Sequence, residues 1–261
     1  MGRFFITGSS DGLGSLTAKN LVAKGHEVVL HARNPDRARD ASAACPGALS
    51  VLVADLTSID ETKNLAAEAN TLGPYEAVVH NAGLYTGYEK IPGKAGLPSL
   101  FTVNTLAPYI LTCLMAPPKR LVYVSSEMHK GGKPNVGANL VNSNYSDSKL
   151  QDVLLAKAFS RKWSESGSGN KVKAPVVEAV YAADPGWVAT KMGGSSAPDR
   201  IEDSVDTFTM LALGEGAAKG RSGGYFRDSK ETKPAKVTED VSLQERLLEE
   251  LAAISGVAVP E

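Results

Sequence analysis

A glycine-rich segment near the start of the chain constrains the fold more than any other feature. Residues 7–14 read TGSSDGLG and lie between a short apolar run and a helical pattern. In that context Gly8 permits a tight turn, Gly12 lets the backbone approach a pyrophosphate, and Gly14 allows close packing of helix on strand. The first amides of the helix then face the phosphates. This arrangement predicts a nucleotide-binding loop, and a plain strand–helix turn that carries glycines is the alternative.

Short apolar runs alternate with helical patterns along much of the chain, and this alternation is typical of right-handed crossovers and a parallel sheet. We therefore predict an α/β fold with a doubly wound, mostly parallel sheet, helices on both faces, and a single domain over residues 1–261. The predicted strands are 4–6, 28–30, 51–53, 77–80, 121–124 and 176–181, and the predicted helices are 15–24, 59–69 and 145–163. Leucines at 243, 247, 248 and 251 predict a last amphipathic helix over the core. Stretches rich in Gly, Pro, Ser and Asn predict loops at 87–99, 130–144, 164–175 and 192–202.

Composition narrows the class of protein. The 261 residues are 43% hydrophobic, and 28 basic against 29 acidic residues leave a formal net charge of −1. This balance predicts neither a nucleic-acid nor a membrane partner. Cys45 and Cys113 are too few for a disulfide framework, and the four His lack metal-ligand spacing, so no metal is expected. No N-terminal signal and no apolar stretch of ~18 residues is visible, so we expect a cytoplasmic protein.

The second predicted strand ends in His31-Ala32-Arg33. In dinucleotide-binding folds an acid at this place binds the ribose diol of NAD, whereas an Arg accommodates the 2′-phosphate of NADP. The acid is absent, and Arg33 can pair with a phosphate through two N–H groups. We therefore expect NADP(H), with NAD(H) as the alternative and a solvated surface Arg as the competing interpretation. His31 either lies beside the adenine or caps the strand.

A tyrosine and a lysine four residues apart indicate the chemistry. Tyr145 and Lys149 begin a predicted helix, where this spacing puts them on one face. A free Tyr, with a pKa of ~10, is a poor base at neutral pH, and a neighbouring ammonium favours the phenolate. Such pairs are common on protein surfaces, so the preceding strand matters. It ends in Ser125-Ser126, at the sheet edge where open α/β folds bind ligands.

Taken together, these motifs resemble the classical short-chain dehydrogenase/reductase family, which has a Rossmann fold, over about the first 190 residues. Asp55-Leu56 resembles the family's adenine contact, and Asn81-Ala82-Gly83 its fourth-strand motif. Pro185–Thr190 resembles the segment that meets the nicotinamide. With the glycine loop and Arg33, the expected cofactor-binding residues are Gly8, Ser10, Asp11, Gly12, Leu13, Gly14, Arg33, Asp55, Leu56, Asn81, Ala82, Gly83, Tyr145, Lys149, Pro185, Gly186, Val188 and Thr190.

The resemblance also implies catalytic roles for four residues. Tyr145 would give a proton to a carbonyl oxygen or take one from an alcohol, and Lys149 would lower its pKa and bind the nicotinamide ribose. Ser126, rather than Ser125, would donate to the substrate oxygen. Asn104 would hold a water of the proton relay, and a buried Asn that satisfies backbone groups is the alternative. The implied activity is NADP(H)-dependent interconversion of a carbonyl and an alcohol. A non-catalytic redox sensor and an epimerase or dehydratase on the same fold are the competing functions.

Three features depart from the family pattern. Asp11 places an anion in the glycine loop, where NADP-preferring members often carry a basic residue. The run from Asn104 to Pro117 is short for the helix that often forms the dimer face, which leaves homodimer, homotetramer and monomer open. Ser126 and Tyr145 are 19 positions apart (145 − 126), more than in many classical members. A serine pair followed by His129, and the tail at 222–226, resemble the retinol-dehydrogenase-like branch.

The substrate is expected to be a hydrophobic ketone, aldehyde or alcohol bound among loops at about 84–99, 127–144 and 187–205. Leu84, Tyr85, Trp187 and Met192 are the apolar candidates for this pocket, and each has simple packing as its alternative. His129 is a further candidate, although a loop His bonded to backbone is the interpretation that the sequence favours.

Overall fold

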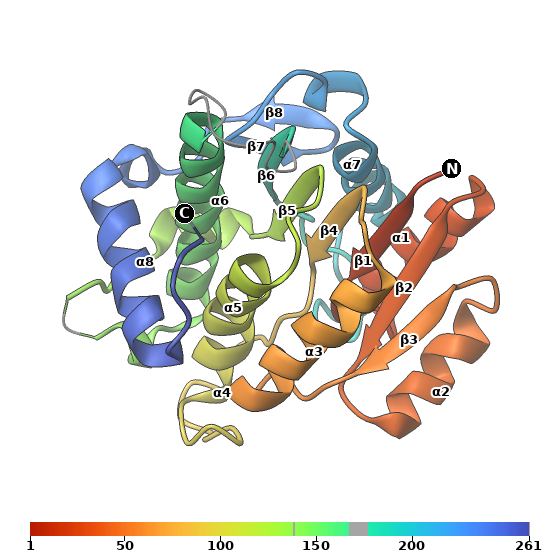
Figure 1. The fold of residues 1–261 in the computed structure, drawn as a ribbon. Helices are drawn as coiled ribbons and strands as arrows, with labels where there is room; N and C mark the ends of the chain where they lie inside the picture. The colour runs from red at the N-terminus through yellow and green to blue at the C-terminus, as the bar shows by residue number, and fades with distance from the viewer. Residues whose placement is uncertain (138, 167–176, 261) are drawn as a thin grey trace.

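The structure of this protein is a computed structural model that describes residues 1–137, 139–166 and 177–260 (Figure 1). Its centre is an eight-stranded sheet in the order β3-β2-β1-β4-β5-β6-β7-β8. Neighbouring strands are parallel, except that β8 runs antiparallel to β7. The strands are β1 (Arg3–Ile6), β2 (Glu27–Ala32), β3 (Ser50–Val53), β4 (Ala77–His80), β5 (Arg120–Val124), β6 (Ala179–Ala183), β7 (Gly224–Arg227) and β8 (Lys230–Thr232).

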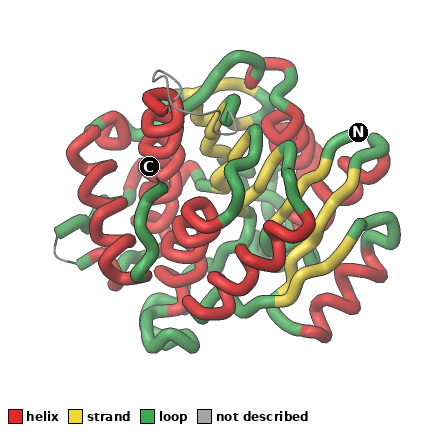
Figure 2. The backbone as a smooth tube through the Cα atoms, in the orientation of Figure 1, coloured by secondary structure: helices red, strands yellow, loops and turns green. Residues whose placement is uncertain are grey.

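Helices cover both faces of this sheet (Figures 1 and 2). The helices α3, α5 and α6 pack with α8 around one hydrophobic cluster, whereas α1, α2 and α7 contribute to a second cluster on the opposite face. The helices are α1 (Gly12–Ala23), α2 (Pro35–Ala44), α3 (Ile59–Leu72), α4 (Ser99–Phe101), α5 (Ala107–Leu114), α6 (Tyr145–Ser166), α7 (Ile201–Leu213) and α8 (Val241–Ser255). This doubly wound, mostly parallel arrangement is the predicted fold class, and it is confirmed.

The central strands are buried on both sides, as the faces of a parallel sheet require. All residues of β4, β5 and β6 are buried, which explains why their sequences are almost continuously apolar. The chain leaves β1 toward β2 and later returns to β4 on the other side of β1. Ligands of open α/β sheets bind at such a reversal, outside the carboxyl ends of the strands.

The first five predicted strands are confirmed to within one residue at each end, except that β2 continues two residues beyond the prediction, to Ala32. The sixth, β6, begins at Ala179 and also ends two residues beyond the prediction. The prediction missed α2 because its Ala-rich and charged sequence buries only Ala41 and so has no apolar stripe. Asn34, whose side chain accepts from Arg37 N, and Pro35 at the first turn were the available signals. Helix α7 and the pair β7–β8 were also missed. Of the predicted loop at 164–175, residues 164–166 belong to α6 and the others lie outside the described residues.

The last helix was predicted as a core cover, and α8 buries Leu247, Leu248 and Leu251 as expected. It packs along α6, and beyond it the Val257 carbonyl accepts a hydrogen bond of 2.8 Å from the Tyr109 hydroxyl of α5. Part of the surface that the resemblance assigned to a dimer contact is therefore covered by the chain's own C-terminal segment (Figure 1). In the described ranges no helix combines the length and apolar character needed to cross a membrane.

Candidate active site

The glycine loop between β1 and α1 lies tightly against the end of β4. Gly8 has φ of +62°, and a Cβ there would lie 2.7 Å from the Ala82 Cα. A Cβ on Gly14 would lie 2.5 Å from the Asn81 Nδ2 and 2.7 Å from the Gly8 carbonyl oxygen. Both contacts are too short for any side chain. Gly12 also has positive φ, +54°, but its Cβ position is open, with no atom nearer than 3.8 Å. The loop is thus closed on its protein side and open on the other.

Buried polar side chains hold this loop in place. The side-chain amide of Asn81 donates to the carbonyls of Thr7 and Gly8 at 2.9 and 3.0 Å. The Thr7 hydroxyl accepts from the backbone amides of Asn81 and Ala82. His31 Nδ1 accepts from the Gly8 amide at 3.0 Å, while Nε2 lies 2.9 Å from the Ala54 carbonyl. Burial lowers the pKa of His31 to about 4. His31 is therefore neutral, and its role is to tie the glycine loop to β2.

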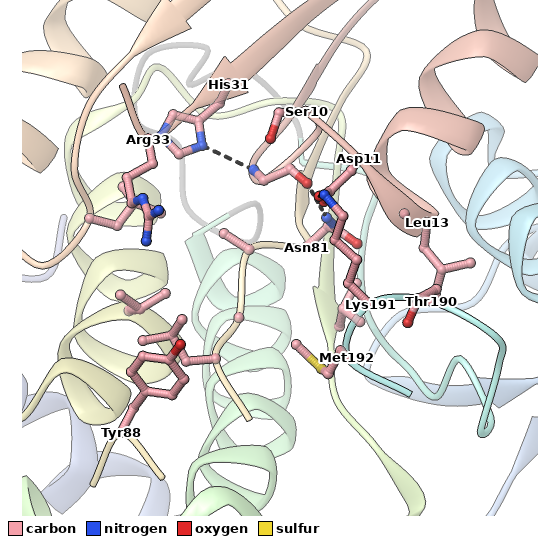
Figure 3. Close-up of a pocket in the computed structure, with 18 of the residues that line it drawn as sticks. Ser10, Asp11, Leu13, His31, Arg33, Asn81, Tyr88, Thr190, Lys191 and Met192 are labelled. Atoms are coloured by element: carbon pink, nitrogen blue, oxygen red, sulfur yellow. Dashed lines mark hydrogen bonds and ion pairs between the residues drawn. The ribbon is translucent and has the colours of Figure 1, made fainter. Parts of the chain in front are cut away.

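A cavity of about 800 Å³ opens at the carboxyl edge of the sheet beside this loop (Figure 3). Figure 3 shows Arg33 and Tyr88 on one side of it and Thr190, Lys191 and Met192 on the other. Most of the expected cofactor residues line it, whereas Gly14, Gly186 and Val188 do not. Those that line it are Gly8, Ser10, Asp11, Gly12, Leu13, Arg33, Asp55, Leu56, Asn81, Ala82, Gly83, Tyr145, Lys149, Pro185 and Thr190.

Basic side chains surround the end of the cavity next to β2. Arg33 is exposed, lines the cavity and forms no ion pair with the described residues. Arg37 of α2 also lines it, donates to the Ser10 hydroxyl at 3.1 Å and forms an ion pair with Asp11. The Asp11 carboxylate also lies 3.0 Å from Lys191 Nζ. Sequence reasoning missed Arg37 because it missed α2. The Asp11 carboxylate, which departs from the pattern of NADP-preferring members, is thus paired with two cations.

The start of α1 is available to an anion. Asp11 is its N-cap residue, but its side chain makes no capping hydrogen bond, because its carboxylate is directed to Arg37 and Lys191. The first amides of a helix lack partners inside the helix and carry the positive end of its dipole. With the open face at Gly12, these amides fit the pyrophosphate of a dinucleotide.

Asp55 lies two residues beyond the end of β3 and lines the cavity. Its carboxylate accepts from the amide and hydroxyl of Thr57 at 3.0 and 2.8 Å, and Lys94 Nζ lies 3.5 Å away. Burial alone would raise the pKa of Asp55, but these hydrogen bonds and Lys94 lower it overall. Asp55 is thus a fixed, ionised acceptor, as an adenine contact requires. Lys94 also ties the loop at 84–99 to the start of α3 through Glu61.

Tyr145 begins α6 and is 8% exposed, with its ring against that of Tyr85 at a centroid distance of 4.7 Å. Burial raises its pKa, while Lys149 and a hydrogen bond with the Ser126 side chain lower it. The expected effect of Lys149 is therefore present, but burial outweighs it in this structure. Lys149 Nζ lies 5.7 Å from the centre of the Tyr145 ring. The structure thus places Tyr145 close to both Lys149 and Ser126.

The two serines after β5 have different surroundings. The Ser125 hydroxyl is buried and donates to the Lys149 carbonyl at 2.7 Å, which anchors α6 to the sheet. The Ser126 hydroxyl accepts only a 3.3 Å contact from the Met128 amide and interacts with Tyr145. The Ser126 hydroxyl is therefore less engaged within the protein than the Ser125 hydroxyl, although Ser125 is the serine that lines the cavity.

Asn104 lies in a π-helical turn, Thr102–Leu106, between α4 and α5. Such turns are frequent at functional sites. Its Oδ1 accepts from the Leu84 amide at 2.7 Å, and its Nδ2 donates to the Leu84 carbonyl and the Ser148 hydroxyl, each at 3.0 Å. Asn104 thus satisfies backbone groups, which is the alternative that the sequence left open. A Cβ on Gly83 would lie 3.6 Å from Asn104 Oδ1 and 3.7 Å from Lys149 Nζ, so Asn104 and Lys149 both approach Gly83.

The segment after β6 closes the other side of the site. Gly186 has φ of +74° and lies against Asp199, whose carboxylate accepts from the Trp187 amide at 2.7 Å. Val188 is buried, whereas Trp187 and Met192 are 56% and 46% exposed. Among the expected substrate residues, Leu84 and Met192 line the cavity, and Tyr85 lies over Tyr145.

His129 does not face the cavity. It is fully buried, with Nδ1 2.7 Å from the Ser126 carbonyl and Nε2 accepting from the Ala235 amide at 3.0 Å. Burial lowers its pKa, and neither ring nitrogen is available to a ligand. Its assignment as a substrate residue is therefore not supported, and the backbone-bonded interpretation describes its position. No cluster of three or more His, Cys, Asp or Glu that could hold a metal occurs in the ranges that the structure describes.

Comparison with known proteins identifies the family of this chain. The profile of the family described as short chain dehydrogenase matches residues 3–201. An oxidoreductase of Emericella nidulans is 46% identical over 100% of this chain and 99% of its own length. The short-chain dehydrogenase chyC of Penicillium rubens is 40% identical over 100% of both chains. This chain belongs to the short-chain dehydrogenase/reductase family and is an oxidoreductase of carbonyl and alcohol groups.

More distant relatives place the chain within this family. Human retinol dehydrogenase 13 is 26% identical over 98% of this chain and 85% of its own, which agrees with the retinol-dehydrogenase-like branch. A structure from Mycobacterium paratuberculosis has a TM-score of 0.78 at 20% identity and covers 100% of this chain and 96% of that one. A blue fluorescent protein in complex with NADPH has a TM-score of 0.64 at 18% identity and covers 86% and 95%. These structures share the fold, and family membership supports a nicotinamide cofactor.

Proposed function

We propose that this protein interconverts a carbonyl and an alcohol on a hydrophobic small molecule, with NADP(H) as its cofactor and Tyr145 as proton donor and acceptor. The observation that carries this proposal is the convergence of Tyr145, Lys149 and Ser126 at the carboxyl edge of the sheet, beside a cavity lined by the glycine loop. A non-catalytic nucleotide-binding protein has no need of a proton donor at that place.

The chain's residues have distinct tasks in this reaction. The cofactor supplies or accepts the hydride when it is bound. Tyr145 protonates the substrate oxygen during reduction or removes the hydroxyl proton during oxidation. The Ser126 hydroxyl donates to the same oxygen and stabilises the charge that develops there. The Lys149 ammonium favours the phenolate of Tyr145 and lies where the cavity would hold the nicotinamide ribose. Asn104 supports this group, since it and Lys149 both approach Gly83.

Preference for NADP(H) rests on two arginines at the end of β2. Arg33 and Arg37 both line the cavity, and neither faces an acid at the strand end that would suit the ribose diol of NAD. Two acids lie beside Arg37: Asp11 is paired with Arg37 and Lys191, and Asp40 is paired with Arg37 from within α2. A 2′-phosphate at this place would meet a predominance of positive charge and planar N–H donors.

A hydrophobic substrate suits the loops around Tyr145. Tyr85, Tyr88, Met128, Trp187 and Met192 are each at least 39% exposed and all belong to these loops, and exposed apolar side chains that lie together can mark a ligand-binding groove. We propose that loops at about 84–99, 127–144 and 187–205 of this single domain form the substrate side. A cytoplasmic location belongs to the same proposal, because both cysteines are free.

Tyr145→Phe tests the proposed chemistry. We expect turnover of any substrate found by screening NADPH oxidation against ketones, aldehydes and quinones to fall by about 10²–10⁴-fold. Tyr88→Phe is the matched control, because Tyr88 lines the same cavity and its loss of a hydroxyl is identical. Near-normal turnover in Tyr145→Phe would show that another group moves the proton.

Arg33→Ala and Arg37→Ala test the cofactor. Each should raise the KM for NADPH about 10- to 100-fold and leave the KM for NADH nearly unchanged, because a hydrogen bond to a charged group contributes about 1.5–3 kcal/mol. Arg39→Ala is the control, since Arg39 is on the same helix as Arg37 but is exposed to solvent and pairs with Asp36. Equal effects on NADPH and NADH would contradict the assignment of these arginines to the 2′-phosphate.

A further inference from the structure

Lys149 has a buried partner that the roles above do not use. Asp152 lies three residues further along α6, and its Oδ2 accepts from Lys149 Nζ at 2.8 Å. Asp152 and Lys149 are 2% and 5% exposed. Within the described part of the chain, Lys149 is the sole cation paired with Asp152. Because a buried charge is costly unless it is paired, each group explains how the other remains ionised.

The contacts of Lys149 leave its ammonium little freedom. An ammonium has three N–H donors. One goes to Asp152 and a second to the Val124 carbonyl at the end of β5, each at 2.8 Å. The third is left for the cavity that Lys149 lines with Tyr145 and Gly83. Val124 holds the amine to the sheet, and Asp152 holds it to the helix, so its remaining donor has one direction.

We propose that Asp152 is a positioning residue that orients the Lys149 ammonium and, through its charge, sets the pH range in which Tyr145 exchanges its proton. This inference rests on the proposed function, in which Tyr145 is the acid and base and Lys149 its partner. It adds a residue to the reaction that the family motifs quoted above do not contain. Asp152 touches neither the cavity nor, in this proposal, the substrate.

Asp152 and Lys149 each affect the pKa of the other and that of Tyr145. Burial raises the pKa of Asp152 to about 6, although Lys149 lowers it. Burial alone would lower the pKa of Lys149, but Asp152 raises it overall. Burial raises the pKa of Tyr145, and Asp152 raises it further, against Lys149. Removal of the negative charge at 152 therefore lowers the pKa of both Tyr145 and Lys149.

Other titratable groups face α6 from the elements packed against it. Tyr85 raises the pKa of Tyr145, and burial keeps the pKa of Tyr123 on β5 well above its usual value. On the side of α8, Glu239 and Glu245 pair with Lys157 and Lys162 of α6 beyond Asp152. The remaining groups on the neighbouring elements are Tyr109 and Cys113 of α5, Arg120 of β5, Glu127, His129 and Lys130 after β5, Tyr181 of β6, Lys236 before α8, and Arg246, Glu249 and Glu250 of α8. Asp152 and Lys149 are the charged groups that act on Tyr145.

Asp152→Asn is the decisive variant, because it keeps the shape and an acceptor oxygen for Lys149 but removes the charge. The pH profile of kcat/KM should move to lower pH by about one unit, in both alcohol oxidation and carbonyl reduction. At its new optimum kcat should stay within about tenfold of the wild-type value. Asp152→Ala, which also removes the acceptor, should lose about 10- to 100-fold and raise the KM for the cofactor.

Asp147→Asn is the matched control. Asp147 is a buried acid on the same helix, but it accepts from Lys133 N, Asn135 Nδ2 and Asn144 N at 2.7–3.0 Å and so anchors the preceding loop. Its substitution should lower stability without a shift of the pH profile. A wild-type pH profile in folded Asp152→Asn would overturn the proposal, since a purely structural role predicts that result. If Asp152→Asn does not fold, Asp152→Ser makes the same prediction with a smaller side chain.

A second measurement separates this proposal from the proposed function. The titration of Tyr145 can be followed without turnover from the ultraviolet absorbance of tyrosinate. The pH titration of Asp152→Asn/Tyr145→Phe is subtracted from that of Asp152→Asn, and the difference reports Tyr145. A midpoint below that of the corresponding wild-type difference supports the action of Asp152 on Tyr145. An unchanged midpoint overturns it. Normal turnover in Tyr145→Phe alone would remove the proposed function, while the tyrosinate midpoint would still report whether Asp152 acts on that residue.

Discussion

The two halves of the candidate site, one formed by the glycine loop and its neighbours and the other by the later loops, are built in opposite ways. On the side of β1 and β2, polar groups such as Thr7, His31 and Asn81 are partnered within the protein, and glycines allow contacts that no side chain could make. On the side of the later loops, large apolar side chains such as Met128, Trp187 and Met192 lie exposed. The first half presents its backbone to a ligand in a fixed form. The second half presents side chains that a ligand would cover.

This difference has a physical reason. Backbone amides can bind a phosphate only if the loop that carries them does not move, so neighbouring groups must satisfy every other polar atom of the loop. Apolar contacts have no such directional requirement, and their free energy follows the area removed from water. We therefore expect substitutions in the first half to affect folding and cofactor binding together. Those in the second half should affect the substrate alone.

The largest effect is expected from Gly8→Ala. The new Cβ would lie 2.7 Å from the Ala82 Cα, and the backbone has φ of +62°. Overpacking and the strained backbone together should lower the free energy of unfolding by about 2–5 kcal/mol and weaken cofactor binding. Urea denaturation and cofactor titration measure the two effects.

Gly25→Ala is the control for backbone strain, because Gly25 has φ of +81° but no atom within 4 Å of its Cβ position. It should cost only about 1–2 kcal/mol and leave cofactor binding intact. Equal losses in the two variants would mean that the close packing of the glycine loop is unimportant.

An effect of intermediate size on the free energy of unfolding is expected when the pH is lowered. The pKa of His31 is lowered from 6.5 to about 4, so the unfolded chain takes up a proton at a pH where the folded chain does not. Its contribution to stability is complete above pH 6.5 and is lost as the pH falls toward 4, by about 3 kcal/mol in total. Protonation would also remove the acceptor of the Gly8 amide, so cofactor affinity should fall in the same pH range.

His31→Gln isolates this contribution, since Gln offers one acceptor and donors but no charge in this range. The difference in unfolding free energy between wild type and His31→Gln should shrink as the pH falls from 6.5 to 4. Parallel curves would mean that His31 does not couple the glycine loop to acid, and that His80 or other groups carry the pH dependence.

The smallest effect on stability is expected from Trp187→Ala. Its side chain is 56% exposed and its Nε1 donates to the Gly193 carbonyl, so the loss should be about 0.5–1 kcal/mol. The KM for an apolar substrate should nevertheless rise severalfold, with the KM for the cofactor unchanged. Leu49→Ala is the control, because Leu49 is exposed at the amino end of β3, at the opposite edge of the sheet. A change in cofactor KM would contradict the division between the two halves.

Much of this site could be predicted because its signals are local. The glycine loop, the pair Tyr145 and Lys149, and Ser126 each occupy a short stretch next to a recognisable strand or helix. Arg37 was missed, because α2 has no apolar stripe and only its capping signals mark it, and because the contact of Arg37 with Asp11 joins two elements. His129 was open to both interpretations, and only its contact with Ala235, 106 residues away, decides that it is buried in a structural role.

The sequence by itself determined the fold class and the class of reaction, because strand alternation, glycine positions and helical spacing act over a few residues. Tertiary structure alone decided which polar groups are satisfied. In the tertiary structure, His31 accepts from the Gly8 amide, Asn104 bonds the backbone of Leu84, and α8 packs on α6. Asp152 is also buried against Lys149. Burial and charge pairing depend on contacts between residues that are distant in the sequence, and short-range patterns do not encode those contacts.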